Sequence, residues 1–167
     1  MVMDEAGSKD RGPDRRLGSS RPDANGAAWF EFTISSNDDA ACRAVQKKIL
    51  DEVHRRGFNN QSVFAIKLAL VEAMINANKH GNRHDPKKKV YVEATVTPRQ
   101  AEIVIEDEGA GFKRAAVPDP TLPENLEKCG GRGIHLMEAY MNHVEWSHGG
   151  RRVRMVKRNE PDVLPRA

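Results

Sequence analysis

The chain lacks several features that would place it in common classes of protein. It has only two cysteines in 167 residues, with neither the spacing of a metal site nor the density of a disulfide scaffold. No apolar run approaches the roughly 18 residues of a membrane span, and the first residues lack the apolar core of a signal peptide. These absences exclude a disulfide-stabilised secreted domain and a membrane-spanning protein, so we expect a cytoplasmic protein with reduced thiols.

The chain also lacks an excess of charge of one sign. Its 27 lysines and arginines nearly balance 24 aspartates and glutamates, for a net charge of +3. This balance argues against a nucleic-acid-binding stripe and a polybasic membrane anchor, so neither partner is expected. Local basic clusters do occur, at 87–89 and in the last strand region, 151–158. They are typical of solubility and of protection of strand edges, with an acidic protein partner as the alternative.

Composition divides the chain into one domain and two tails. Residues 1–26 are rich in Arg, Asp, Gly, Ser and Pro and have almost no large apolar side chains, which predicts a disordered tail. Residues 159–167 contain two prolines and are expected to be loose. The segment between them, 27–158, is long enough to bury one continuous core.

The first candidate site element is an acidic and amide pair on a predicted helix. Glu72 and Asn76 are four residues apart and share a helix face, and His80 continues the stripe one turn on. Such a pair alone is equally compatible with a solvated surface, but here it flanks a core stripe formed by Val63, Ile66, Leu70, Ala73 and Ala77. An edge position favours a cleft, in which the Asn76 oxygen suits Mg²⁺ and Glu72 can act as a base. His80 can also pack or cap at the helix end.

The second element is a carboxylate at the end of a predicted strand. Asp107 is followed by Gly109, Gly111 and Phe112, and the glycines let the backbone leave the sheet and approach a ligand closely. Asp107 can accept a hydrogen bond from an exocyclic amine such as that of adenine. The alternative is an ordinary Asp-Gly loop without a ligand, because these residues dominate turns.

The third element is a glycine-rich turn that leads into an apolar periodic segment. Gly130, Gly131 and Gly133 surround Arg132 and precede Ile134, which reads as a loop entering a helix. Free backbone N–H groups at such a start bind anions, and Arg132 can add a bidentate phosphate contact. The alternative is a simple chain reversal. The Walker pattern G-x-x-x-x-G-K-[ST] is absent.

These three elements, in this order, resemble the boxes of the ATPase superfamily that includes gyrase, the ninety-kilodalton heat-shock protein and sensor histidine kinases. Glu72 to Asn76 matches the E-x-x-x-N box, Asp107 to Gly111 the D-x-G-x-G box, and Gly131 to Gly133 the later G-x-G box. The compact form of these boxes is most similar to the anti-sigma-factor serine kinases of bacterial partner-switching systems. The resemblance covers about residues 29–158.

The resemblance implies a function and roles for single residues. It implies an ATP-dependent protein serine/threonine kinase that acts as an anti-sigma factor and phosphorylates a STAS-type anti-sigma-factor antagonist, with a sigma factor as second partner and a possible homodimer. The alternative is a catalytically inactive ATP-binding module that captures a protein partner. Glu72 would be the general base, Asn76 the Mg²⁺ ligand and Asp107 the adenine contact. The remaining ATP-binding residues would be His80, Gly109, Gly111, Phe112, Gly130, Gly131, Arg132, Gly133 and Ile134.

Periodicity completes the predicted architecture. Apolar and polar residues alternate over 29–34, 90–96 and 101–105, and further strands are expected at 143–147 and up to residue 158. Helices are expected from a cap at 36–38 to about residue 56, after a cap at 59–62, and over 131–141. The proline-containing loop 113–128 is too long for a plain connector and is predicted to be a lid. Together these elements predict an α+β fold: a two-layer α/β sandwich with a mixed, mostly antiparallel sheet and helices on one face. The resemblance implies in addition the Bergerat topology of histidine kinase-like ATPases.

Overall fold

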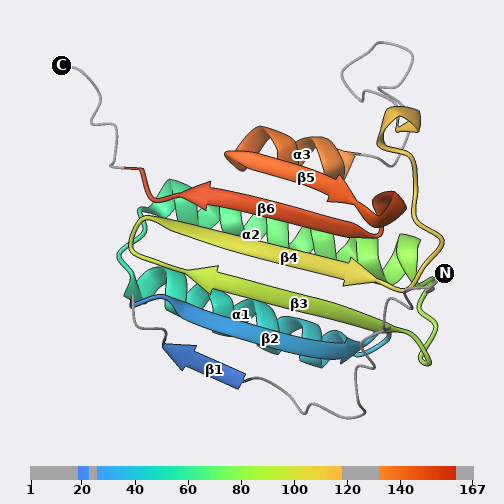
Figure 1. Ribbon diagram of the computed structural model, residues 1–167, viewed down its shortest axis with the longest axis horizontal. Helices are drawn as coiled ribbons and strands as arrows, with labels where there is room; N and C mark the ends of the chain where they lie inside the picture. Colours follow the sequence, from blue (N-terminus) through green and yellow to red (C-terminus); the bar gives the residue numbers. More distant parts are fainter. Residues whose placement is uncertain (1–18, 23–25, 118–131, 161–167) are drawn as a thin grey trace, which may run out of the picture.

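A computed structural model of the chain describes residues 19–22, 26–117 and 132–160 (Figure 1). It contains a six-stranded sheet in the order β1-β2-β3-β4-β6-β5. The strands are β1 (Ser19–Pro22), β2 (Ala28–Ser35), β3 (Lys89–Val96), β4 (Gln100–Asp107), β5 (His143–Ser147) and β6 (Arg152–Arg158). The helices are α1 (Asp39–Arg55), α2 (Asn60–Ile75) and α3 (Arg132–Tyr140), with a π-helical segment η1 (Asn76–Gly81) and short 3-10 segments η2 (Arg114–Ala116) and η4 (His148–Gly150).

The predicted two-layer α+β fold is confirmed, with two refinements. Helices α1, α2 and α3 lie on one face of the sheet (Figure 1). Every strand pair among the described residues is antiparallel, whereas a mixed sheet was expected. Within the predicted N-terminal tail, Ser19–Pro22 forms strand β1 and pairs with β2, which the apolar-poor composition did not predict. The remainder of that tail and residues 161–167 lie outside the described residues.

The helix starts follow the capping residues that the sequence offered. The Asp38 Oδ1 accepts a hydrogen bond from the N–H of Ala41 at 2.9 Å and begins α1. The Asn59 Oδ1 accepts from the N–H of Ser62 at 2.7 Å and begins α2. Each cap satisfies one of the N–H groups that a helix start leaves without a partner.

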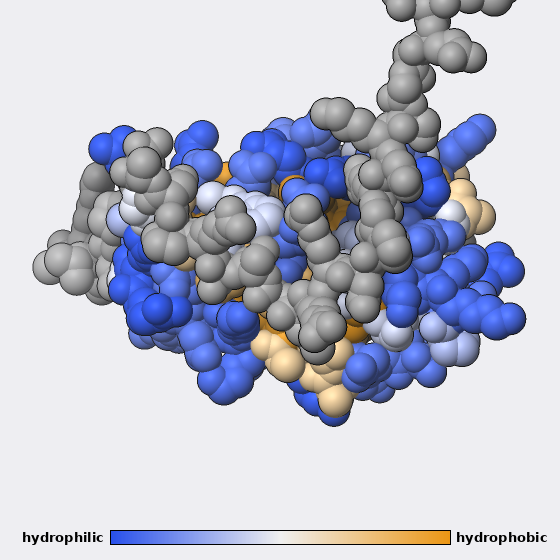
Figure 2. All heavy atoms as spheres, turned by 60° about the horizontal axis from the view of Figure 1, so that its bottom comes forward, coloured by the Kyte–Doolittle hydropathy of each residue, from blue (hydrophilic) through white to orange (hydrophobic). Residues whose placement is uncertain are grey.

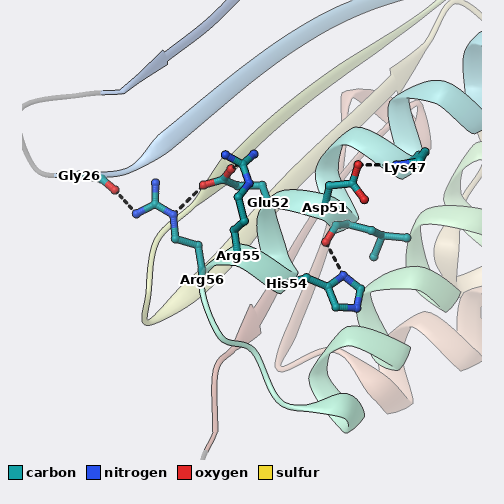
Figure 3. A network of polar contacts seen from close by, with 8 residues as sticks. Gly26, Lys47, Asp51, Glu52, His54, Arg55 and Arg56 are labelled. Atoms are coloured by element: carbon teal, nitrogen blue, oxygen red, sulfur yellow. Dashed lines mark hydrogen bonds and ion pairs between the residues drawn. The ribbon is translucent and has the colours of Figure 1, made fainter.

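The other end of α1 is held by a buried carboxylate. Glu52 is only 4% exposed and accepts a hydrogen bond from Arg56 Nε at 2.7 Å (Figure 3). Arg55 also pairs with Glu52, and Arg56 donates to the carbonyl oxygen of Gly26. A buried carboxylate requires such partners to offset its desolvation, so the network fixes α1 against the segment that enters β2.

The core lies between the helices and the inner face of the sheet. It is formed by alternate strand residues and by the inward stripes of α1 and α2, with Ile34, Ile49, Ile66, Leu70, Ile103, Ile105, Met137 and Met155 among its fully buried side chains. The opposite sheet face carries cross-strand ion pairs instead. Arg154 binds Glu102 through two hydrogen bonds of 2.9 and 2.7 Å, and Arg152 binds Glu106 at 2.9 Å.

The exposed surface of the described part of the chain is mainly hydrophilic on the face shown in Figure 2. None of the helices in the described ranges combines the length and apolar character needed to cross a lipid bilayer.

Candidate functional site

The three sequence elements meet around one cavity of about 400 Å³. Its walls come from α2 and η1, the end of β4, the start of α3, and the turn between β5 and β6. The predicted site residues that line it are Glu72, Asn76, His80, Asp107, Gly111, Phe112, Arg132, Gly133 and Ile134. Gly109 does not line the cavity itself, and Gly130 and Gly131 lie outside the described residues, as does most of the predicted lid.

The cavity wall that carries Glu72 and Asn76 changes from an α-helix to a π-helix at Asn76. The α-helix ends at Ile75 and a π-helix runs over Asn76–Gly81, ending with the hydrogen bond from Asn82 N–H to Ala77 O at 2.8 Å. Glu72 and Asn76 keep their one-turn spacing, while His80 follows after a wider turn; all three still line the cavity. Single π turns inside helices are frequent at functional sites.

Asn76 presents an unsatisfied polar group inside this wall. Its Nδ2 is buried and has no hydrogen-bond partner among the described residues. Buried amides in folded proteins are normally hydrogen-bonded, and a half-turn of the side chain exchanges the nitrogen and oxygen. The position therefore offers an oxygen to a cation, which fits the donor chemistry of a Mg²⁺ site.

Glu72 faces the start of α3. A Cβ atom added to Gly133 would lie 2.2 Å from Glu72 Oε2, so only glycine allows this close approach. The backbone of the first turn of α3 is thereby brought beside the carboxylate, and the N–H groups at a helix start are suited to anions. Arg132, at the same helix start, is exposed and lines the cavity.

Asp107 forms the buried end of the cavity. Its side chain is 8% exposed, and its Oδ1 accepts a hydrogen bond from the N–H of Gly109 at 2.7 Å. Burial raises the pKa of Asp107, and the bond from Gly109 only partly opposes that shift. The other carboxylate lone pairs remain available, so this end can accept a hydrogen bond from a ligand amine.

Glycines allow the chain to pack closely around Asp107. A Cβ atom on Gly81 would lie 2.4 Å from the Asp107 carboxylate, and one on Gly109 would lie 2.1 Å from the Gly81 carbonyl oxygen. Gly111 has a φ of +76°, and its missing Cβ leaves room for the carbonyl oxygen of Gly149. The predicted role of these glycines as shapers of a ligand loop therefore has a steric basis.

Sequence reasoning missed the contribution of the turn between β5 and β6. The Phe112 N–H donates to Gly149 O at 2.9 Å, and the Phe112 ring packs edge-on against Trp146 with centroids 4.9 Å apart. Arg151 lines the cavity and accepts a hydrogen bond from the Asp107 N–H through its carbonyl oxygen, at 3.1 Å. Gly149 and Gly150 are residues typical of a turn, but no local pattern indicated that this turn would lie beside Asp107.

Among residues 19–22, 26–117 and 132–160, no three histidine, cysteine or carboxylate side chains are grouped so that they could hold a metal ion.

Most of this chain is similar in sequence to known proteins. A sequence model of the family described as histidine kinase-like ATPase domain matches residues 35–157. The serine-protein kinase RsbW of Bacillus subtilis is 30% identical over 140 residues, which cover 80% of this chain and 87% of that protein. The anti-sigma F factor of Oceanobacillus iheyensis is 37% identical over 83 residues, or 48% of this chain and 56% of that protein. That of Clostridium perfringens is 36% identical over 83 residues, or 48% and 59%. The chain thus spans only a little over half the length of the anti-sigma F factors that it matches.

Proposed function

The chain belongs to the histidine kinase-like ATPase domain family, and from this premise we propose that it is an ATP-dependent protein serine/threonine kinase that also acts as an anti-sigma factor. Membership of the family implies ATP binding. The observation that carries the proposal is the meeting of Glu72, Asn76 and Asp107 around one cavity. Such a transfer needs a proton acceptor, an oxygen ligand for magnesium and a group that recognises adenine, and these are the roles proposed for Glu72, Asn76 and Asp107.

The residues at the two ends of the cavity favour one orientation of bound ATP. Asp107, buried at one end, suits the exocyclic amine of adenine, while Arg132 and the start of α3 suit the phosphates. Asn76 would hold Mg²⁺, which when bound neutralises charge on the phosphates. Glu72 would accept the proton of a seryl or threonyl hydroxyl as that oxygen bonds to the γ-phosphorus and ADP leaves.

The names of the relatives support a sigma factor as a partner, and the family resemblance supports an antagonist as the substrate. Proteins called anti-sigma F factor and serine-protein kinase RsbW are similar to this chain over 83 and 140 residues. We therefore propose a sigma factor as one partner and a STAS-type anti-sigma-factor antagonist as the phosphorylated substrate, in the cytoplasm. A homodimer is part of the same proposal.

The proposal is tested by phosphotransfer itself. Purified protein is incubated with labelled Mg-ATP and a protein extract of the organism that encodes it, beside the Glu72→Ala variant. A small labelled protein that appears only with the wild type would establish a kinase and provide its substrate for identification. Absence of any labelled protein, from a preparation that binds ATP, would favour the non-catalytic module that captures a partner.

A further inference from the structure

Asn82 is a buried asparagine beside the Asp107 end of the cavity. It follows Gly81, the last residue of η1, which lines the cavity, but Asn82 itself is not among the described residues that do so. Its side chain is fully buried. Its backbone N–H donates to Ala77 O at 2.8 Å, and its carbonyl oxygen accepts from the N–H of Asp85 at 3.1 Å. The backbone of Asn82 is therefore fixed to η1 and to the turn that follows.

The side-chain amide of Asn82 connects the ends of two strands. The register between β3 and β4 stops at the pair of Val90 and Asp107. Beyond this pair, Asn82 Nδ2 donates to Lys89 O at 2.8 Å, and Asn82 Oδ1 accepts from the N–H of Glu108 at 2.8 Å. An amide offers a donor and an acceptor together, so it bonds both backbone groups at the point where the strand pairing ends.

The same residue ties the Asp107 backbone to η1. Gly81, directly before Asn82, lies so close to the Asp107 carboxylate that an added Cβ would be 2.4 Å from it. The N–H that Asn82 Oδ1 accepts belongs to the peptide bond between Asp107 and Glu108. On the other side, the Asp107 N–H donates to Arg151 O at 3.1 Å. Asp107 is thus held between Asn82 and the residue that precedes β6.

We propose that Asn82 is a positioning residue for adenine recognition, which holds the Asp107 carboxylate where it can accept a hydrogen bond from the exocyclic amine of the base. The inference rests on the proposed function, in which Asp107 contacts adenine. A recognition group must be held to within about 0.5 Å by supporting hydrogen bonds, because a hydrogen bond weakens steeply as its geometry departs from the optimum. Loss of the Asn82 amide would therefore reduce selectivity for adenine. The proposed phosphate contacts, at the start of α3, would be unaffected.

A purely structural role for Asn82 predicts a different result. Loss of two buried hydrogen bonds would lower stability, but it would affect all nucleotides equally. Asn78, also in η1, is a matched control because it is 7% exposed and its amide also makes two bonds. Its Oδ1 accepts from Ser36 Oγ at 3.2 Å, and its Nδ2 donates to Cys42 Sγ at 3.3 Å. Among the described residues, Asn78 lines a separate pocket and not the cavity that holds Asp107.

The test compares two nucleotides that differ at the proposed contact. Mg-ATP and Mg-ITP, in which a carbonyl oxygen replaces the amine of adenine, are titrated calorimetrically into the full chain. We expect the wild type to bind ATP at least about tenfold more tightly than ITP. In Asn82→Ala this ratio should fall by at least about fivefold through weaker ATP binding, while the ITP affinity falls by no more than about twofold. Asn78→Ala should keep the wild-type ratio even if its Tm is lower.

Two further variants examine the route of the effect. Asn82→Ser is milder, because its hydroxyl can still bond one of the two backbone groups, and its ratio should lie between those of the wild type and Asn82→Ala. If Asn82 acts through Asp107, the two substitutions should not be additive. Asn82→Ala added to Asp107→Asn should then change ATP affinity by less than about twofold.

The other outcomes separate the inference from the proposed function. Equal losses of ATP and ITP affinity in Asn82→Ala, or the same fall in ratio in Asn78→Ala, would overturn the positioning role. If Asn82→Ala does not fold, a wild-type ratio in Asn82→Ser would overturn it instead. Wild-type protein that binds ATP and ITP equally would refute Asp107 as the adenine contact, and wild-type protein that binds neither would refute the proposed function.

Discussion

The carboxylate of Glu72 lies against the α-carbon of Gly133, where an added methyl group would come within 2.2 Å of Oε2. This contact brings the middle of the chain and its last helix together at the cavity. Gly133, the last glycine of the G-R-G sequence, has no unusual φ, so backbone flexibility is not the reason for a glycine at this position. Glycine is required there to leave room for the proposed base.

The Gly133→Ala variant should therefore affect activity more than stability. The colliding atom is the end of a flexible side chain, so Glu72 can rotate away at small cost to folding. We expect phosphotransfer to fall by about tenfold or more, as displaced catalytic groups do, with little change in Tm. Single-turnover kinetics and thermal denaturation measure the two effects. A large fall in Tm with an unchanged transfer rate per folded molecule would contradict this account.

The Glu72→Ala variant should bind ATP and fail to transfer phosphate. Removal of a general base typically costs about 10²–10⁴-fold in rate, while Glu72 contributes no attractive contact to the phosphates. Calorimetry with Mg-ATP and the transfer assay, run on the same preparation, separate the roles. A variant that no longer binds ATP would show that Glu72 holds the nucleotide instead.

The Asn76→Ala variant should lose the magnesium dependence of ATP binding. Its buried amide has no hydrogen-bond partner in the described residues, so truncation leaves no new unsatisfied group and the fold should persist. We expect ATP affinity with magnesium to fall by about tenfold or more, and affinity measured in EDTA to stay the same. Wild-type affinities that are equal with and without the metal would remove Asn76 from the metal site.

The Gly109→Ala variant should damage the site through lack of space. Its Cβ would lie 2.1 Å from the backbone oxygen of Gly81, which cannot move without shifting η1. Because the clash is with backbone, we expect this substitution to lower the free energy of unfolding by about 1–3 kcal/mol. Chemical denaturation should show the lower stability, and ATP titration should show a weaker affinity for ATP.

Gly149→Asn is the control for that variant. Gly149 has a left-handed φ of +68° but open space around its missing Cβ, and asparagine tolerates this conformation. It should keep both stability and ATP affinity near the wild-type values. Equal damage from the two substitutions would mean that glycine flexibility, and not space, matters at Gly109.

The Asp107→Asn variant should be more stable than the wild type near neutral pH. Burial raises the pKa of Asp107, so the folded chain binds the proton more tightly than the unfolded chain does. Ionised Asp107 therefore lowers stability once the pH exceeds the unfolded pKa, and the penalty is complete above the folded pKa. The excess Tm of the variant should be largest at about pH 7 and vanish below the ordinary aspartate pKa of about 4.

The same variant should bind ATP at least about tenfold more weakly. The substituted side chain can keep the bond from Gly109 with its amide oxygen, but it would then present an N–H₂ group to the amine of adenine. Titration with ATP near neutral pH checks this prediction. Unchanged affinity would show that the base contacts other residues.

Local sequence patterns predicted most of the fold. The caps at Asp38 and Asn59 and the strand alternation in β2, β3 and β4 are short-range signals, and the elements lie where they indicate. Strand β1 was missed because its segment lacks apolar residues and it is held by backbone pairing with β2. The π-helix was missed because over one turn its side-chain pattern differs little from that of an α-helix.

The candidate site was predictable as a set of residues but not as a complete enclosure. The motif spacing selected Glu72, Asn76 and Asp107, which line one cavity. The parts contributed by Trp146 and Arg151 depend on strand β6 pairing with β4, which no local pattern reveals. Whether the glycines at 130 and 131 and the predicted lid close the site stays a prediction, because they lie outside the described residues.

The strand order has a consequence for how the cavity forms during folding. Short turns join β3 to β4 and β5 to β6, so each hairpin can form from neighbouring residues. The cavity is completed only when β4 pairs with β6, which joins residues far apart along the chain. A nucleotide would therefore meet its full set of contacts only at the end of folding, and by mass action it would trap the finished chain and slow its reopening.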